Sequence, residues 1–242
     1  MGRAPAIAVL ALLAIGCNED PTNEMVQTVG YRSGVGDTTS GERGNIKISE
    51  VLWSGSVNDA GVRDQSDVFI ELKNEGALPV NITNWIIEQS GTFTVTWRIP
   101  ETDNNVLGVG DRLVIAAKDT GCFPHADIIM PELRLPDGAP FKLTLRDSDE
   151  RLIEPIGSKT MPPFAGGYDY VRSRSMERIE MMFGGYGSEP RSWHYYTPLR
   201  DEEEDVPNND LIAAVCQNGT LASPGRANSP DYSGAFAAGN LE

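Results

Sequence analysis

Short runs of alternating apolar and polar residues recur every 10–15 residues between residues 45 and 157. The clearest run, Asp67–Lys73 (DVFIELK), places Val68, Ile70 and Leu72 on one face. A period of two residues is the pattern of a β-strand with one buried face. Strands of this length, separated by turn-forming residues, predict an all-β, immunoglobulin-like sandwich.

Further strands are predicted along the same stretch. In the first of them the alternation is imprecise, with Ile46, Ile48 and Glu50 on one side, which predicts a β-bulge or register change near Glu50. The predicted strands besides Asp67–Lys73 are Asn45–Trp53, Val80–Gln89, Gly91–Pro100, Arg112–Lys118, Asp127–Met130 and a pair around a hairpin at Asp147–Glu150.

The pattern weakens from Ser158 onward, which predicts a loop-rich C-terminal extension. Residues 173–182 fit either a strand or a short helical turn, and residues 201–210 form an acidic insertion. We expect the sandwich to span residues 44–228, with a C-terminal tail at 229–242.

The composition supports this fold and limits the classes of partner that the protein is expected to bind. Gly (25 residues) and Pro (16 residues) are abundant, as expected of many turns, and the net charge is −15. Such an acidic chain repels phosphate backbones and anionic lipid headgroups, so nucleic acid is not an expected partner.

The first residues differ from the rest. Arg3 precedes an apolar run, Ala4–Ile15, which is too short to span a bilayer but suits a signal peptide. The run ends LLAIGC and resembles the lipobox of bacterial lipoproteins, although Ala14 stands where leucine is usual. The resemblance implies cleavage after residue 16, lipid attachment at Cys17 and a membrane-anchored protein of the bacterial cell envelope, at the outer membrane or its periplasmic face. Residues 17–43 would then form the lipidated, flexible tether. The alternative is an ordinary signal peptide that leaves Cys17 unpaired.

Two cysteines remain for the folded part. An even pair in an exported protein predicts one disulfide, here between Cys122 and Cys216, closing a loop of about 95 residues. The alternative is two buried free thiols. A zinc site is not expected, because only His125 and His194 are available as additional histidine ligands.

Several weak motifs, in order, point to one family. These motifs are ISEV (48–51), DVFIELKNEG (67–76), NWIIE (84–88), VLGVGDRLVIA (106–116) and LPDGAPFKLTLRDSDERLIE (135–154). Together they resemble the lamin-tail domain, an immunoglobulin-like sandwich also found in exported bacterial proteins. SMERI (175–179), Trp193 and SPGRAN (223–228) are similar to the closing pieces of bacterial members. Phe69 replaces the family's usual tryptophan, and Val109 its usual proline.

The sequence shows no set of residues typical of an enzyme active site. No nucleophile elbow, phosphate loop or metalloprotease motif occurs, so we predict no catalytic residue. We interpret Glu71 as structural, pairing across strands or binding a loop amide, and Phe69 as covering part of a surface or edge. Asp147, Asp149 and Glu150 are the candidate Ca²⁺ ligands, with an ordinary hairpin turn as the alternative. No other cofactor is expected.

Aromatic residues supply the candidate ligand contacts. Trp193, Tyr195 and Tyr196 are concentrated in SWHYYTP, and GGYDY adds Tyr168 and Tyr170. Exposed rings can stack on a glycan or peptide, but core aromatic residues give the same pattern. The sequence favours a non-catalytic module that binds a protein or glycan partner or serves as a structural envelope component. A divalent-metal hydrolase that uses the acidic loops is the alternative.

Overall fold

The computed structural model describes residues 44–179, 186–197 and 209–230. The predicted signal peptide, Cys17, the tether, residues 201–208 of the acidic insertion and nearly all of the predicted tail lie outside the described residues. Within the described residues, no helix is both long and apolar enough to cross a membrane.

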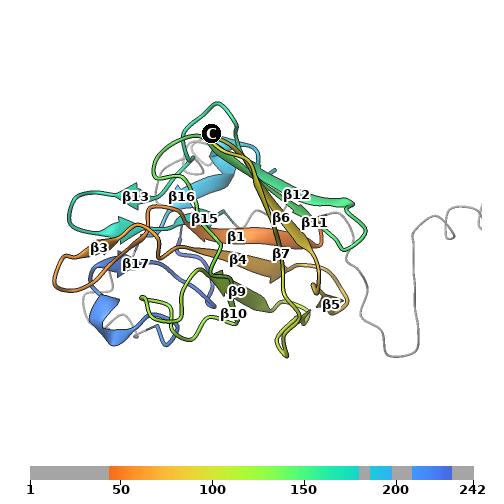
Figure 1. Cartoon of the computed structure of the whole chain (residues 1–242), viewed down its shortest axis with the longest axis horizontal. Helices are drawn as coiled ribbons and strands as arrows, with labels where there is room; N and C mark the ends of the chain where they lie inside the picture. The colour runs from red at the N-terminus through yellow and green to blue at the C-terminus, as the bar shows by residue number, and fades with distance from the viewer. Residues whose placement is uncertain (1–43, 180–185, 198–208, 231–242) are drawn as a thin grey trace, which may run out of the picture.

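Two large β-sheets stack to form the body of the protein (Figure 1). The all-β sandwich predicted from the alternation is confirmed. The six-stranded sheet has the order β10-β9-β4-β1-β15-β16, with β10 at Ile128–Ile129, β9 at Arg112–Ala116, β4 at Phe69–Asn74, β1 at Ile46–Leu52, β15 at Met176–Arg178 and β16 at Trp193–Tyr195. The four-stranded sheet has the order β12-β11-β6-β7, with β12 at Leu152–Gly157, β11 at Phe141–Arg146, β6 at Ile86–Gly91 and β7 at Val95–Arg98.

Smaller elements accompany the two large sheets among the described residues. Three small sheets are made by β13 (Gly167–Tyr168), β14 (Ser173–Arg174) and β17 (Thr220–Leu221), by β2 (Ser56–Val57) and β3 (Arg63–Asp64), and by β5 (Val80–Asn81) and β8 (Val106–Leu107). Two single-turn 3₁₀ helices span Pro190–Ser192 and Ala214–Cys216.

The main core lies between the two large sheets. Ile70 and Leu72 of β4 pack there, as their alternation predicts, together with Ile87 of β6 and Leu143 of β11. All four side chains are fully buried. Each buried aliphatic side chain of this size contributes roughly 1.5–3 kcal/mol through removal of apolar surface from water.

The bulge predicted near Glu50 is confirmed. The register between β1 and β4 shifts between Ile48 and Glu50. As a result Ile48 and Val51 both contact the main core, whereas Leu52 joins the opposite face of the sheet. Because a bulge adds one residue to one strand, it redirects every later side chain of that strand.

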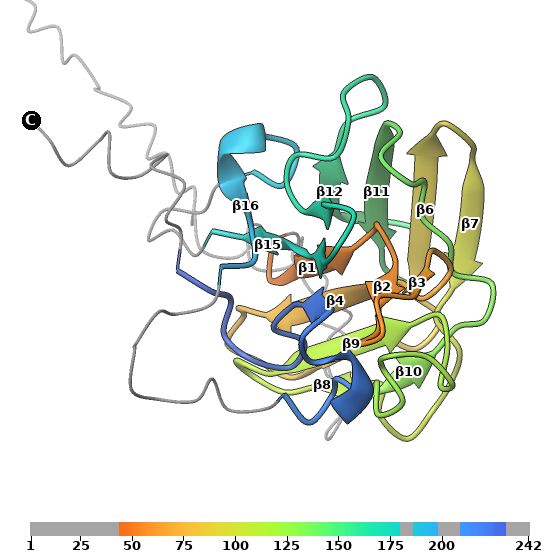
Figure 2. The same ribbon diagram turned by 90° about the vertical axis from the view of Figure 1, so that its left-hand side faces the viewer.

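The outer face of the six-stranded sheet is also buried. Phe69, expected to cover a surface or edge, instead lies fully buried in a second core, so that prediction was wrong. Its ring centroid is 4.8 Å from that of Phe123, and Ile212 packs in the same cluster. The reason is the C-terminal extension, whose residues 211–222 return to cover this face (Figure 2).

The predicted disulfide is confirmed and lies in this second core. Cys122 and Cys216 are joined across 94 positions of the chain, with their Cα atoms 5.8 Å apart. Both cysteines pack with the cluster that covers Phe69. The bond therefore links the loop after β9 to the C-terminal extension.

One predicted strand was wrong in its extent. Val80–Gln89 divides into β5 and β6, because Asn84 adopts a left-handed backbone conformation (φ 63°) between them. The two pieces then pair with different strands, β5 with β8 and β6 with β11. The hairpin predicted at Asp147–Glu150 is present between β11 and β12.

Gln89 offers a direct test of the core. Its amide faces the core from β6, fully buried, and neither its oxygen nor its nitrogen has a hydrogen-bond partner. Replacing Gln89 by Met removes the desolvation cost, so we expect the free energy of unfolding to rise by about 1–2 kcal/mol. Urea denaturation measures it, with exposed Gln65→Met as the control; a loss of stability for Gln89→Met would contradict the prediction.

The disulfide supplies a second stability test. We expect Cys122→Ala combined with Cys216→Ala to lower the free energy of unfolding by about 2–5 kcal/mol, because the unfolded chain regains the freedom of a long loop. Cys17→Ala is the matched control, since it removes a cysteine without touching this bond. Equal stability of the double variant and the control, measured by urea denaturation, would refute the stabilising role.

Candidate functional site

Three glutamates lie side by side across the middle of the six-stranded sheet. Glu71 is on β4, Glu50 on β1 and Glu177 on β15, and Glu50 is the cross-strand partner of both others. All three are fully buried. We call them the glutamate row. Like charges opposite one another destabilise a sheet, so the row requires hydrogen-bond donors or bound protons.

The donors come from residues 223–229, which we call the cap. Each carboxyl of the row accepts a backbone N–H from the cap. The bonds are Ser223 N to Glu50 Oε1 (2.9 Å), Gly225 N to Glu71 Oε2 (2.7 Å) and Ser229 N to Glu177 Oε2 (3.0 Å). The hydroxyl of Ser223 adds a bond to Glu177 Oε1 at 2.5 Å. The SPGRAN motif, together with Ser229 directly after it, therefore donates hydrogen bonds to three buried carboxyls.

Basic side chains stand at both ends of the row. Arg112 Nη1 is 2.7 Å from Glu71 Oε1 and also donates to the side chain of Asn228 in the cap. At the other end, His194 Nε2 lies 3.7 Å from Glu177 Oε2. The middle member, Glu50, has a carboxyl neighbour on each side.

Burial raises the pKa of all three carboxyls. For Glu177 the pKa is raised to about 7, mainly by desolvation. For Glu50 it is raised well above the usual range, first by desolvation and then by the charges of Glu177 and Glu71. Desolvation also raises the pKa of Glu71, but Arg112 opposes the rise. Glu71 is thus the member that holds a negative charge most readily, and the row retains protons near neutral pH.

Glu71 is placed as the sequence predicts. It pairs across strands with Ser49, whose hydroxyl lies 2.5 Å from Glu71 Oε1, and it binds the loop amide of Gly225. Glu50, Glu177 and Arg112 were not identified as its partners from the sequence. The motifs ISEV and SMER contain both glutamates, but their convergence depends on the bulge in β1 and on long-range strand pairing.

A second buried ion pair joins the two sheets. Glu154 on β12 accepts the backbone N–H of Ile48 at 2.6 Å, and Arg178 on β15 lies 3.0 Å from its other oxygen. The guanidinium of Arg178 also sits 5.1 Å from the ring centroid of Trp193. These contacts fix β15 against β12.

The candidate Ca²⁺ ligands lie in the hairpin between β11 and β12. Asp147 accepts the backbone N–H groups of Asp149 and Arg151, and its other oxygen accepts Nε of Arg151 at 2.7 Å. Glu150 has a left-handed backbone conformation (φ 64°) in the turn. Within the part of the chain that the structure describes, no group of three acidic, histidine or cysteine side chains is arranged to hold a metal ion.

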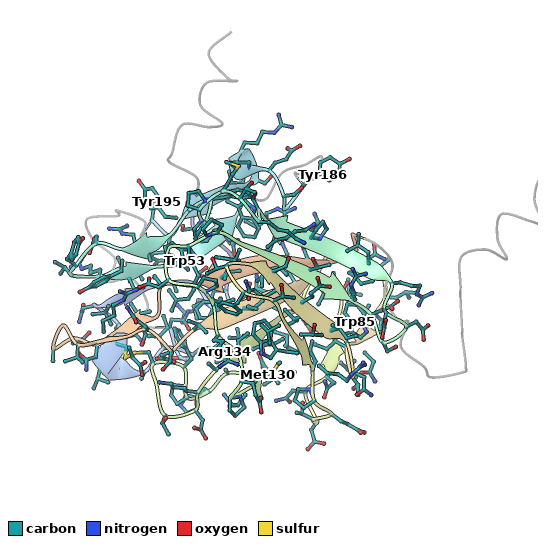
Figure 3. The ribbon with its side chains drawn as sticks, turned by 45° about the horizontal axis from the view of Figure 1, so that its top comes forward. Trp53, Trp85, Met130, Arg134, Tyr186 and Tyr195 are labelled. Carbon is teal, nitrogen blue, oxygen red and sulfur yellow. A yellow bond between two sulfur atoms is a disulfide. The ribbon has the colours of Figure 1, made fainter. Side chains whose placement is uncertain are left out.

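The candidate aromatic contacts divide between interior and surface. Trp193 is buried, and its indole N–H donates to the carbonyl of Gly187 at 2.9 Å. Tyr196 is half-buried, and this desolvation raises the pKa of its hydroxyl. Tyr195 is 48% exposed and projects from the molecule (Figure 3). Of these three, Tyr195 is the most open to a ligand.

Two further tyrosines lie on the β13–β14 hairpin. The rings of Tyr168 and Tyr170 are 5.8 Å apart, and Tyr170 is 89% exposed. The guanidinium of Arg63 lies 4.3 Å from the Tyr168 ring, and that of Arg174 lies 5.6 Å from the Tyr195 ring. Arg174 also pairs with the residue preceding Tyr168. We call Tyr168, Tyr170 and Tyr195, with Arg63 and Arg174, the tyrosine–arginine patch.

The tyrosine–arginine patch lies at the end of the sandwich away from residue 44. Asn45 bonds with Glu75 where β1 begins. Trp53, just after the other end of β1, donates its indole N–H to Ala165 beside β13. Figure 1 accordingly shows β3, β13 and β17 at one end of the molecule and β5 at the other. Residue 44, the first described residue, therefore lies at the opposite end of the sandwich from the tyrosine–arginine patch.

A hollow of about 520 Å³ lies at the edge of β9. Asp103, Asp111 and Asp127 line it together with Arg112 and Gly225 of the cap. Asp127 Oδ2 accepts the backbone N–H of Val114 at 2.8 Å, so its carboxylate covers part of the strand edge. The hollow is open and polar, and we assign it no reaction.

The glutamate row predicts how stability depends on pH. In the unfolded chain the carboxyl of Glu177 titrates near 4.5, and in the folded chain near 7. Between these values the folded state binds more protons, so raising the pH destabilises it. We expect the free energy of unfolding to fall on the order of 1–3 kcal/mol from pH 5 to pH 8.

Urea denaturation across this pH range tests the prediction. Glu177→Gln should flatten the profile, whereas exposed Glu101→Gln should leave it unchanged. A wild-type stability that rises from pH 5 to pH 8 would rule out proton retention by the row.

Part of the chain matches a known protein family. Residues 39–158 match the family model of the Lamin Tail Domain. No curated protein matches the chain. The matched region covers β1 through β12 and therefore both large sheets apart from β15 and β16.

Proposed function

Because this chain belongs to the lamin tail domain family through residues 39–158, we propose that it is a lipid-anchored, non-catalytic module of the bacterial cell envelope. On this proposal, Cys17 carries the lipid and residues 18–43 connect it to the sandwich. The module then presents the tyrosine–arginine patch to a protein or glycan partner.

The observation that carries the proposal is the position of the tyrosine–arginine patch. Exposed rings stacked with guanidinium groups are the side chains that recur at binding surfaces. Here they lie at the end of the sandwich away from residue 44. A tether holding that residue near a membrane would leave the patch facing outward.

The glutamate row supports the non-catalytic part of the proposal. A general acid or base must reach a substrate within hydrogen-bond distance. The three buried carboxyls instead bind the cap of their own chain, with no exposed surface. Their raised pKa values have a structural cause.

Anchoring is tested by metabolic labelling with palmitate in a bacterial host. We expect label in the wild-type protein and none in Cys17→Ser, since the thiol is the acylation site that the lipobox implies. Equal labelling of both proteins, or a mature amino terminus far from residue 17, would contradict the anchor.

Partner binding is tested by crosslinking on intact cells. Tyr170→Ala combined with Tyr195→Ala should reduce capture of a saturable partner at least about tenfold, in line with the loss of stacked aromatic contacts. Tyr186→Ala is the matched control, because Tyr186 is 73% exposed and outside the tyrosine–arginine patch. Equal capture by all three proteins would move the binding surface elsewhere.

The absence of catalysis is tested on ester, phosphate and glycoside substrates. We expect no turnover with or without Ca²⁺. Turnover that is lost in Asp147→Ala and Asp149→Ala would support the metal-dependent hydrolase instead.

A further inference from the structure

Three of the four outer strands of the large sheets have a covered or interrupted edge. On β12, Pro155 faces outward and has no N–H, and Gly157 N donates to the carbonyl of Gly187 at 3.1 Å. Beside β9 lie the two-residue strand β10 and the carboxylate of Asp127. On β16, the carbonyl of Tyr195 accepts the hydroxyl of Thr197 at 3.3 Å. Such features prevent strand addition at a sheet edge.

The fourth outer strand, β7, has an open edge. Trp97 pairs with Ile87, and Ile99 N donates to Trp85 O at 2.8 Å, so odd-numbered residues of β7 bond toward β6. The backbone groups of Thr96 and Arg98 therefore point outward, since antiparallel bonding alternates along a strand. Among the described residues, none bonds to them on that side. Figure 2 shows β7 as the outermost strand of its sheet.

The exposed side chains along β7 suit a β-sheet partner. Thr94, Thr96 and Arg98 are exposed on one face, while Trp97 is buried on the other. Residues 92–100 contain no acidic residue, although the chain has 35. The strand also contains no proline and no bulge. It therefore lacks the features that hinder strand addition at the other three edges.

We propose that β7 pairs antiparallel with β7 of a second copy of this chain, about a two-fold axis at Thr96. This register places Thr96 opposite Thr96 of the second copy and Thr94 opposite Arg98 of the second copy. The outward backbone groups then bond across the axis, and the two four-stranded sheets become continuous.

The charges favour this register over others that a second copy could adopt. Arg98 is the only charged residue of β7, and it faces a threonine rather than its own counterpart. The nearest carboxylate on β6, Glu88, lies opposite Thr96 and is 3.5 Å from Arg146, which offsets its charge. An isologous pair of one strand per copy also closes on itself and does not grow into a fibre.

The interface is small, so the dimer is weak. Pairing of about five residues per copy falls below the standard size of a stable interface. We expect dissociation constants on the order of 10 µM to 1 mM. The inference is independent of the proposed function, because it rests on the β7 edge and not on the tyrosine–arginine patch.

Sedimentation equilibrium of the full chain in detergent tests the register. Thr94→Glu should tighten the dimer about 2- to 30-fold, because it creates two Glu–Arg cross-strand pairs. Thr96→Glu should weaken it, because two carboxylates then face each other. Thr96→Pro should abolish it by removing the outward N–H. Exposed Thr160→Glu, outside β7, is the matched control with the same change of charge.

The two glutamate variants give opposite signs only in this register. Thr94→Glu is a gain, so it cannot be mistaken for a folding defect, and Thr94→Glu and Thr160→Glu should both keep the wild-type unfolding midpoint within error. A monomer at every concentration up to about 1 mM, or the same effect from both glutamate variants, would overturn the proposal. Protection of the Thr96 amide from hydrogen exchange only on adding a different protein would also overturn it, in favour of a foreign strand.

Discussion

Burial of both faces of the six-stranded sheet is the constraint on which the rest of the structure depends. One face packs against the four-stranded sheet through Ile70 and Leu72. The other is covered by the C-terminal extension, which meets an apolar half around Phe69 and a polar half at the glutamate row. The cap has no regular secondary structure, so its backbone groups need other partners, and the three carboxyls bond three of its N–H groups.

The two halves of the outer face hold the extension by different means. In the apolar half, burial and the Cys122–Cys216 bond restrain it. In the polar half, the glutamates bind the cap from residue 223 to residue 229. Buried carboxyls are unfavourable unless every oxygen finds a donor, so the row specifies one position of the cap and tolerates few others. The same burial explains why protons stay bound near neutral pH.

The sequence predicts the local features of this fold well. Alternation in DVFIELK identified the inner face of β4, and the break at Glu50 identified the bulge, because both depend on neighbours along the chain. Cysteine pairing predicted the disulfide. The prediction for Phe69 was wrong because its cover comes from residues about 140 positions later, which no local pattern encodes. The division of Val80–Gln89 depended on one left-handed residue, Asn84.

The candidate sites were predictable only in part. Tyr168, Tyr170 and Tyr195 stood out as aromatic residues, but their grouping with Arg63 and Arg174 required the fold. Trp193 came from the same short motif and lies on the same face of β16 as Tyr195, but it packs in the main core, whereas Tyr195 stands at the exposed end of the strand. The open edge of β7 also emerged only from the pairing of the strands. On the two proposals made above, the module presents ligand contacts at one end and a strand edge at its side.

Hydrogen exchange of the backbone amides in the cap tests most directly whether the glutamate row holds the cap in place. If the glutamate row holds the cap as part of the cooperative fold, the amides of Ser223, Gly225 and Ser229 will exchange as slowly as those of β1 and β4. Exchange of these three amides at the rate of an exposed loop, while β1 and β4 remain protected, would contradict it.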